Sequence, residues 1–272
     1  MKANEAWLNT INDILKQGTA VASQRSTGAG GRVSFEVLAH TMHFQISHPI
    51  VTLKPNTSWL YMCAEPLWVL SGSSQLNWCP EIEKIQGPYS DNQVTLAGAY
   101  GPPFKAQMEY VIDKLNSDRN TRQAVMTIWR RNPMESKDIP CTVAIQFLIR
   151  NDVLNCIVTM RSSDVGMGLP YDMLTFACMT AEIASKLEDS TGLGTCYITA
   201  GSRHIYQDQL DKLLFIYKHA SELIDKADDK YNAWQVWTWP AIKEKMEIIA
   251  LSPYEDRSLY QSIAKQRLLG AS

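Results

Sequence analysis

The strongest constraint on the fold comes from residues 141–161. Apolar side chains alternate along CTVAIQFLIR, as in a half-buried strand, at Val143, Ile145, Phe147 and Ile149. Asn151 and Asp152 form a turn signal, and VLNCIVTMR follows as a second strand. Because a hairpin returns the chain to its starting edge, we expect Cys141 and Arg161 at the same end of a sheet.

The rest of the chain mixes helices and strands. Helices are expected up to Gly18 and at residues 59–70, 104–116, 173–187, 207–226 and 254–269, and strands at 33–46, 121–129 and 196–206. Pro66 lies inside one predicted helix, and turn-forming residues make 23–32 and 77–104 look irregular. Since no regular βαβ alternation appears, we expect a single α+β domain over residues 1–272.

Composition excludes several classes of protein. The 272 residues include 26 basic and 28 acidic side chains, for a formal net charge of -2, which argues against a nucleic-acid partner. The six cysteines form no CxxC pair and no zinc-finger spacing, so no metal site is predicted and a reducing compartment is expected. An amphipathic start and the lack of a long apolar run predict a cytoplasmic protein without a membrane span.

Cys141 is the first candidate for chemistry. A lone cysteine is commonly a buried structural thiol, and that alternative stays open. A nucleophilic cysteine needs thiolate character, which a nearby positive charge favours. Arg161, at the end of the paired strand, can supply that charge, so the hairpin turns Cys141 into a candidate nucleophile.

Three polar groups follow along the chain. Arg161, Ser162, Ser163 and Asp164 read either as a solvated turn or as an anion clamp, because arginine and serine donate to phosphate oxygens. Asp172 precedes a buried helix, where it is either an N-cap or a carboxylate facing a polar ligand. His204 and Tyr206 alternate on a strand and share one side, although a core histidine is the alternative.

These signals occur in a recognisable order. The runs IPCTVAIQFLI, MRSSDVGMGLPYDM and GSRHIY, together with upstream QRSTGAGG, AEPLWVLSG, GAYG and NTRQAV, resemble the thymidylate synthase superfamily over about residues 20 to 210. The resemblance implies a large mixed β-sheet flanked by helices and a sheet-to-sheet homodimer. It also implies that Cys141 attacks C6 of a pyrimidine nucleoside monophosphate, whose C5 then accepts a one-carbon unit from 5,10-methylenetetrahydrofolate.

The resemblance also implies roles for other residues. Phosphate binding would fall to Arg25, Arg161 and Ser162, and to Arg122 from the partner subunit, with Gln123 where the family has a second arginine. His204 and Tyr206 would hold the sugar hydroxyl, Glu65 would organise water for proton transfer, and Tyr100 would assist C5 deprotonation. Asp164 would bind the pterin ring of the folate, and Gln86 would lie near the folate.

The sequence departs from thymidylate synthases most informatively at Asp172, where they carry asparagine. An ionised carboxylate only accepts hydrogen bonds, so it suits the amino group of cytosine and repels O4 of uracil. Aspartate at this position is the mark of cytidylate hydroxymethylases. Thr142, in place of a histidine, and Ser202, in place of an aspartate, resemble that branch as well.

The expected activity is therefore a deoxycytidylate or cytidylate 5-hydroxymethylase. Alignment from Tyr100 places Gln86 where thymidylate synthases keep a tryptophan, and a polar side chain there could admit water. The alternatives are a deoxycytidylate 5-methyltransferase that releases dihydrofolate, a thymidylate synthase acting on dUMP, and a nucleotide-binding regulatory protein without catalysis. The last 50 residues do not resemble the family's usual tail.

Overall fold

A six-stranded sheet forms one layer of the computed structural model, which describes residues 1–23, 32–130, 135–220, 233–251 and 257–269. The strands are β1 (Thr19–Ser23), β2 (Arg32–Gln45), β3 (Val125–Thr127), β4 (Thr142–Arg150), β5 (Val153–Asp164) and β6 (Gly192–Tyr206). Their order across the sheet is β1-β2-β6-β5-β4-β3. The predicted strands are thus present, and the sheet is mixed as expected, because β5 and β6 pair in parallel and the other neighbours are antiparallel.

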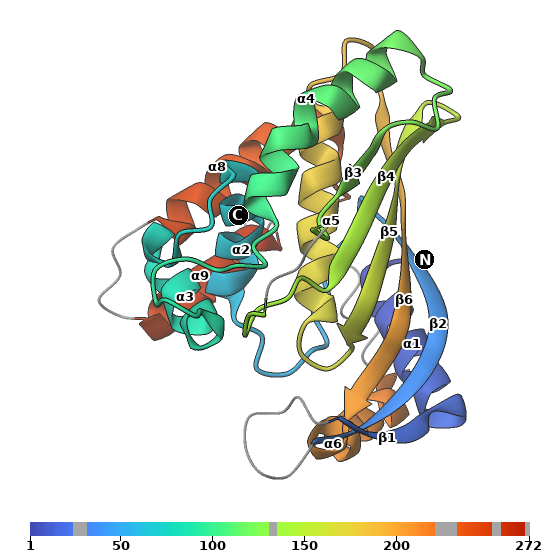
Figure 1. Cartoon of the computed structure of the whole chain (residues 1–272), viewed down its shortest axis with the longest axis vertical. Helices are drawn as coiled ribbons and strands as arrows, with labels where there is room; N and C mark the ends of the chain where they lie inside the picture. The colour runs from blue at the N-terminus through green and yellow to red at the C-terminus, as the bar shows by residue number, and fades with distance from the viewer. Residues whose placement is uncertain (24–31, 131–134, 221–232, 252–256, 270–272) are drawn as a thin grey trace.

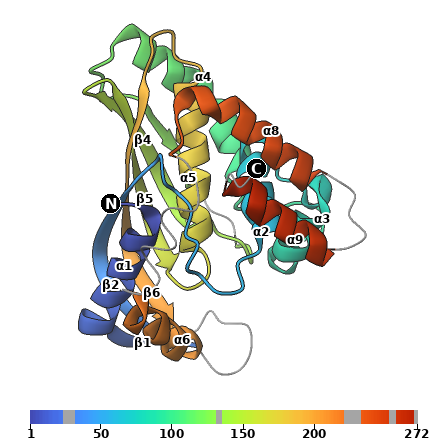
Figure 2. The same ribbon diagram turned by 180° about the vertical axis from the view of Figure 1, so that it is seen from behind.

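Helices form a second layer against one face of this sheet (Figures 1 and 2). Their bounds are α1 (Ala3–Gln17), α2 (Trp59–Ser71), α3 (Pro80–Gln86), α4 (Gly101–Ser117), α5 (Leu169–Ala184), α6 (Gln207–Lys218), α8 (Trp239–Ala250) and α9 (Arg257–Leu268). Short 3-10 turns occupy Leu76–Trp78, Gly87–Tyr89 and Val236–Thr238. None of these helices is both long and apolar enough to cross a membrane, within the described part of the chain.

The predicted hairpin forms two neighbouring strands inside the sheet, between β6 and the edge strand β3. β4 and β5 pair antiparallel, and both turn residues, Asn151 and Asp152, have left-handed backbones with φ of 53° and 57°. This is the backbone of a tight two-residue hairpin turn. The register is irregular between Thr142 and Ala144. Such a bulge bends the strand and re-aims neighbouring side chains, here directly after Cys141.

The structure adds to one expectation about the chain path and contradicts another. The chain shows no regular βαβ alternation, as expected, but β5, α5 and β6 form one βαβ unit, with the almost wholly buried α5 as the crossover between parallel strands. Residues 77–104 were expected to be irregular, yet α3 lies within them. Pro80 opens that helix at a position where no backbone N–H is needed, so the proline favours the helix instead of interrupting it.

α2 is buried along almost its whole length and includes Pro66. The Ser58 hydroxyl caps its start by accepting from the backbone N–H of Tyr61 at 3.3 Å. The C-terminal helices α8 and α9 lie beside α2 (Figures 1 and 2). Gln261 on α9 accepts from the backbone N–H of Trp59 at 2.6 Å, so the C-terminal segment holds the start of α2.

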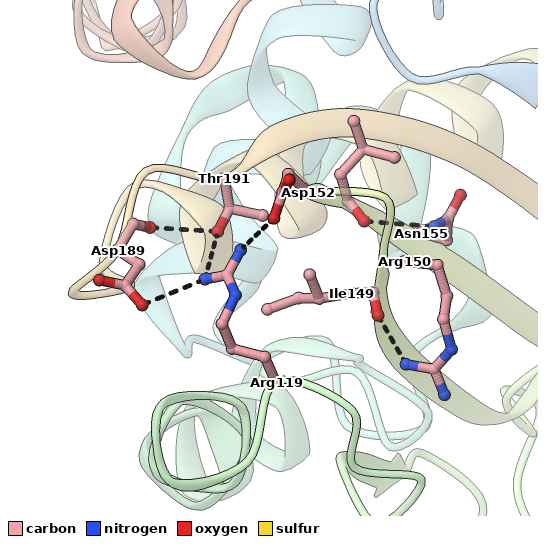
Figure 3. A network of polar contacts seen from close by, with 8 residues as sticks. Arg119, Ile149, Arg150, Asp152, Asn155, Asp189 and Thr191 are labelled. Carbon is pink, nitrogen blue, oxygen red and sulfur yellow. Dashed lines mark hydrogen bonds and ion pairs between the residues drawn. The ribbon is translucent and has the colours of Figure 1, made fainter.

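The opposite end of the hairpin is tied to its neighbours by a network whose two carboxylates are exposed (Figure 3). Arg119, just after α4, donates to Asp152 in the hairpin turn and to Thr191 before β6, each at 3.3 Å. It also lies 3.6 Å from the carboxylate of Asp189. One arginine therefore connects the β4–β5 turn with the α5–β6 connection.

Candidate functional site

Cys141 lies at the bulged start of β4, and Arg161 lies beside it as the hairpin predicts. The Arg161 guanidinium donates to the carbonyls of Ile139 at 2.8 Å and Pro140 at 3.0 Å. Its Nη2 is 3.7 Å from the Cys141 sulfur. A cation at this distance favours the thiolate over the thiol, and the two carbonyl bonds hold that cation in place.

Five of the predicted residues line one pocket: Cys141, Glu65 from α2, Gln86 from α3, Tyr100 before α4 and Asp172 from α5. They lie up to 107 positions apart in the chain, from Glu65 to Asp172, and the fold brings them together. Trp68, Val69 and Leu96 add apolar surface to the lining. An apolar surface beside convergent polar groups suits a flat heteroaromatic ring.

Glu65 sits in a polar network. The Tyr61 hydroxyl donates to its Oε1 at 2.6 Å, and the Thr175 hydroxyl donates to its Oε2 at 3.3 Å. Burial raises the pKa of Glu65 to about 7, against the lowering effect of these two hydrogen bonds. A carboxyl group with this pKa can both accept and release a proton near neutral pH.

Tyr100 is hydrogen-bonded next to the nucleophile. Its hydroxyl accepts from the backbone N–H of Thr142 at 3.2 Å. Burial, followed by the nearby Cys141 and Asp172, raises the pKa of Tyr100 well above its usual value. The phenol therefore keeps its proton and can donate it within the pocket. The adjoining turn is tight, because the N–H of Gly98 donates to Asp138 at 2.6 Å and a Cβ on Gly98 would collide with that carboxylate.

Asp172 lies in the first turn of α5 and is not its N-cap, which is Gly168. Burial raises the pKa of Asp172 well above its usual value, and the nearby Glu65 raises it further. Arg203, which is fully buried on β6, acts in the opposite direction and favours the ionised carboxylate. Two opposing effects therefore act on the protonation of Asp172: burial favours the neutral acid, and the buried Arg203 cation favours the carboxylate.

Asp164, His204 and Tyr206 gather at the ends of β5 and β6. Asp164 pairs with His204 in the strand register, and the rings of His204 and Tyr206 lie 4.9 Å apart, on the same side as predicted. Burial raises the pKa of Asp164 and lowers the pKa of His204, so burial favours the neutral form of each group despite their mutual attraction. The guanidinium of Arg32 stacks 3.8 Å from the centre of the Tyr206 ring.

The predicted phosphate-binding residues are not all brought together. Arg161 and Ser162 lie on β5 near Cys141, but the Arg161 guanidinium is engaged by carbonyl oxygens. Arg122, expected to act in the partner's site, is exposed on the segment before β3 and is not among the residues that line the Cys141 pocket. Arg25 and its glycine-rich segment lie outside the described residues.

Sequence reasoning missed three residues of the site. Tyr61 precedes Glu65 by four positions on α2, a helical spacing that places two side chains on one face. Thr175 follows Asp172 on α5 and contacts the other oxygen of Glu65. Arg203 interrupts an alternating strand with a fully buried charge, and its guanidinium donates to Ser163 at 2.7 Å and to the carbonyl of Ile198 at 2.9 Å.

Comparison with known protein families supports this reading of the fold. The thymidylate synthase family matches the chain over residues 5–238, which includes every residue of the pocket described above. The match ends before α8 and α9, as expected from the unusual C-terminal sequence. The chain therefore belongs to the thymidylate synthase family, whose members are folate-dependent transferases that act on C5 of a pyrimidine nucleotide.

Proposed function

We propose that this enzyme is a cytidylate 5-hydroxymethylase that prefers deoxycytidylate. The observation that carries the proposal is that Asp172 lines the same pocket as Cys141 and Glu65. In this family the corresponding asparagine matches uracil, whereas a carboxyl group can match cytosine. The bound substrate would then present C6 to the thiol and its amino edge to Asp172.

The nucleophilic step belongs to Cys141. With Arg161 at 3.7 Å from its sulfur, the thiolate adds to C6 of the ring, and C5 becomes nucleophilic. Tyr100, whose hydroxyl accepts from the backbone N–H of the residue after Cys141, would take part in proton transfer at C5. Glu65, with a pKa of about 7, exchanges protons with water in the pocket.

Methylenetetrahydrofolate, when bound, supplies the one-carbon unit. The lining supports binding of a planar group of this kind, because it includes Trp68, whose ring is held by an indole N–H that donates to the carbonyl of Gln75 at 3.0 Å. Gln86 on the same lining offers polar contacts to a heterocycle. Asp164 lies with His204, outside the residues that line the Cys141 pocket, so its contact with the pterin ring stays a proposal that needs a wider site.

Selection of the base depends on the proton of Asp172. The ionised carboxylate accepts from the amino group of cytosine and repels O4 of uracil. A proton shared with N3 completes a second bond to cytosine, but a fully protonated acid could also pair with uracil. Arg203, by favouring the ionised form, therefore supports discrimination against uracil. A misplaced polar contact costs about 1–3 kcal/mol, or roughly tenfold to hundredfold in selectivity.

The remaining contacts follow the family pattern and are proposed on that ground. Ser162, Arg161, Arg25 and Arg122 of the partner subunit would bind the phosphate, and His204 and Tyr206 the sugar hydroxyl. A homodimer is supported by the face of the sheet that lies opposite the helices (Figure 2). Val125 and Tyr197 are exposed and alternate along their strands with the buried Met126 and Ile198, so their side chains point away from the core. The hydroxyls of Thr41 and Thr199 are paired at 2.8 Å across β2 and β6.

Incubation with dCMP, CMP and dUMP in the presence of methylenetetrahydrofolate tests the activity. We expect 5-hydroxymethyl-dCMP as the main product, without the rise in absorbance that accompanies dihydrofolate. That absorbance during dCMP turnover would indicate a methyltransferase, and turnover of dUMP alone would contradict the role of Asp172. Binding of dCMP without release of tritium from C5 would indicate a regulatory protein.

The dimer has its own test. Sedimentation at twice the mass of the chain is expected. Mixtures of inactive Cys141→Ser and Arg122→Ala proteins should regain activity, because a mixed dimer holds one site with both residues intact. No recovery in a mixture shown to exchange subunits would place Arg122 outside the partner's site.

A further inference from the structure

A hydrogen-bonded chain of three side chains links α3 to α2 at the edge of the pocket. The amide nitrogen of Gln86 donates to the hydroxyl of Tyr61, and this hydroxyl donates to Oε1 of Glu65 at 2.6 Å. Gln86 and Glu65 line the pocket, whereas Tyr61 is 4% exposed and lies behind them. The ring of Tyr61 meets the ring of Tyr171 edge to face, with centroids 5.1 Å apart, which fixes its position.

The direction of each hydrogen bond follows from the chemistry of the groups. Burial, followed by the nearby Glu65, raises the pKa of Tyr61 well above its usual value, so the phenol keeps its proton. An ionised Glu65 can only accept, so that proton must point to Oε1. The Tyr61 oxygen is then left as an acceptor, and Gln86 must present its NH₂ group to it.

This assignment fixes the other half of the Gln86 amide. The oxygen and nitrogen of an amide point in different directions from one carbon, so Oε1 of Gln86 does not take part in the contact with Tyr61. Gln86 therefore has an acceptor left for a ligand of the pocket, and Glu65 offers a second acceptor on the same lining. Two acceptors on one wall are what a water molecule needs in order to be held and deprotonated.

We infer that Tyr61 is a positioning residue that aligns Gln86 and Glu65 as a joint binding site for the water that becomes the hydroxyl group of the product. This inference rests on the proposed hydroxymethylation and extends it to a residue that touches neither substrate. Without Tyr61, the two pocket residues would lose the group that fixes their orientation relative to each other.

The step balances within the groups already named. After transfer, the nucleotide carries a methylene group on C5 and the Cys141 sulfur on C6. The water oxygen forms a bond to the methylene carbon, and a water proton passes to the Glu65 carboxylate. The electron pair of the exocyclic double bond moves to form C5=C6, and the C6–S bond breaks to release the Cys141 thiolate. No oxidant or reductant is required.

Tyr61→Phe removes one hydroxyl and leaves the ring. Loss of a hydrogen bond that favours the ionised carboxylate should raise the pKa of Glu65 by about one unit. This shift is measured in the nucleotide-free protein by ¹³C NMR of labelled glutamate carboxyls, with the Glu65→Gln spectrum to assign the signal. In turnover, the acidic limb of the pH–rate profile should move upward by the same amount. The hydroxymethyl product should fall about tenfold relative to hydrogen release from C5.

Tyr171→Phe is the matched control. It also removes one hydroxyl, a part-buried one that accepts from the backbone N–H of Ser58 at 2.9 Å and is not a hydrogen-bond partner of Glu65. The control should leave the Glu65 titration and the product ratio unchanged. An unshifted titration and an unchanged product ratio in Tyr61→Phe would reduce Tyr61 to a packing residue and overturn the inference.

Gln86→Leu provides a second route if Tyr61→Phe fails to fold. It removes the pocket acceptor but keeps the Tyr61–Glu65 bond, so the hydroxymethyl product should fall while the Glu65 titration moves little. An unchanged product ratio in Gln86→Leu would exclude the joint water site. Failure of the proposed function is distinguishable, because the wild-type protein would then give no hydroxymethyl product, whereas the NMR titration still reports on Tyr61.

Discussion

The two ends of the β4–β5 hairpin show how one pair of strands can serve two purposes. At the Cys141 end, burial raises the pKa values of Glu65, Tyr100 and Asp172, and so determines which groups carry protons. At the turn end, the carboxylates that surround Arg119 are largely exposed, with 89% of the Asp152 side chain accessible. The difference teaches that ionisable groups at this hairpin acquire shifted pKa values where the packed helices and sheet exclude water, and not where their carboxylates are solvated.

The largest expected effect is the loss of the nucleophile. Cys141→Ser should lower kcat by at least about a thousandfold, because a serine hydroxyl in this position lacks thiolate character and a neighbouring base. Cys79→Ser is a suitable control, since Cys79 is the N-cap of α3 and serine is favourable at such a position. Substantial turnover by Cys141→Ser, with an unchanged circular dichroism spectrum, would show that Cys141 is not the nucleophile.

The next largest effect concerns stability and pH. The pKa of Glu65 is about 7 in the folded protein and 4.5 in an unfolded chain, so the folded state holds the proton more tightly. Stability from this group is complete below pH 4.5 and is lost as the pH rises to 7. Glu65→Gln cannot ionise, so it does not lose this stability. The free energy of unfolding of Glu65→Gln, relative to that of the wild-type protein, should therefore rise with pH, by at most about 3 kcal/mol once the pH is above 7.

Urea unfolding at pH 5 and pH 8 measures this slope. Asp189→Asn at the exposed end of the hairpin, taken through the same experiment, reports the effect of removing a carboxylate that water already solvates. If Glu65→Gln and the wild-type protein lost stability in parallel between the two pH values, Glu65 would not be the buried acid that the site requires.

The sequence predicted which strands bring the site together better than it predicted the side-chain hydrogen bonds within the site. Strand alternation and the Asn151-Asp152 turn were enough to place Cys141 beside Arg161, because a hairpin is a local structure. The Tyr61–Glu65 contact is local as well, but Gln86 and Thr175 join it from other helices, and no periodicity encodes such packing. The buried charge of Arg203 depends on β6 lying between β2 and β5, which only the fold determines.

Two features that the sequence did not predict, α3 and the parallel pairing of β5 with β6, have related causes. The abundance of proline and glycine in residues 77–104 was interpreted as irregular, although Pro80 begins a helix. The parallel pairing of β5 and β6 was missed because α5 is apolar on nearly all sides and gives no amphipathic period that would suggest a crossover helix. The role of Arg25 and the dimer contact through Arg122 stay predictions.

A change in base preference should be smaller than the effects above. Asp172→Asn replaces the carboxyl group that we propose to match cytosine with an amide that donates to O4 and accepts from N3–H of uracil. We expect kcat/KM for dCMP to fall and kcat/KM for dUMP to rise, each by about tenfold to hundredfold. Competition between the two nucleotides in one reaction measures the ratio directly. An unchanged ratio would show that Asp172 does not face the base, even though it lines the pocket.

The smallest effect is expected at the turn end of the hairpin. Arg119→Ala removes contacts of 3.3 Å to Asp152 and Thr191 and 3.6 Å to Asp189, whose carboxylates are mostly in water. Exposed pairs of this kind contribute about 0–1 kcal/mol, and salt screens them. The loss of unfolding free energy should therefore stay below about 1 kcal/mol and shrink further in high salt, with kcat unchanged.

Arg161→Ala, which removes the cation beside the Cys141 sulfur, should instead lower kcat strongly. If Arg119→Ala reduced kcat as much as Arg161→Ala does, the two ends of the hairpin would be coupled through the strands, and burial would not be what separates them.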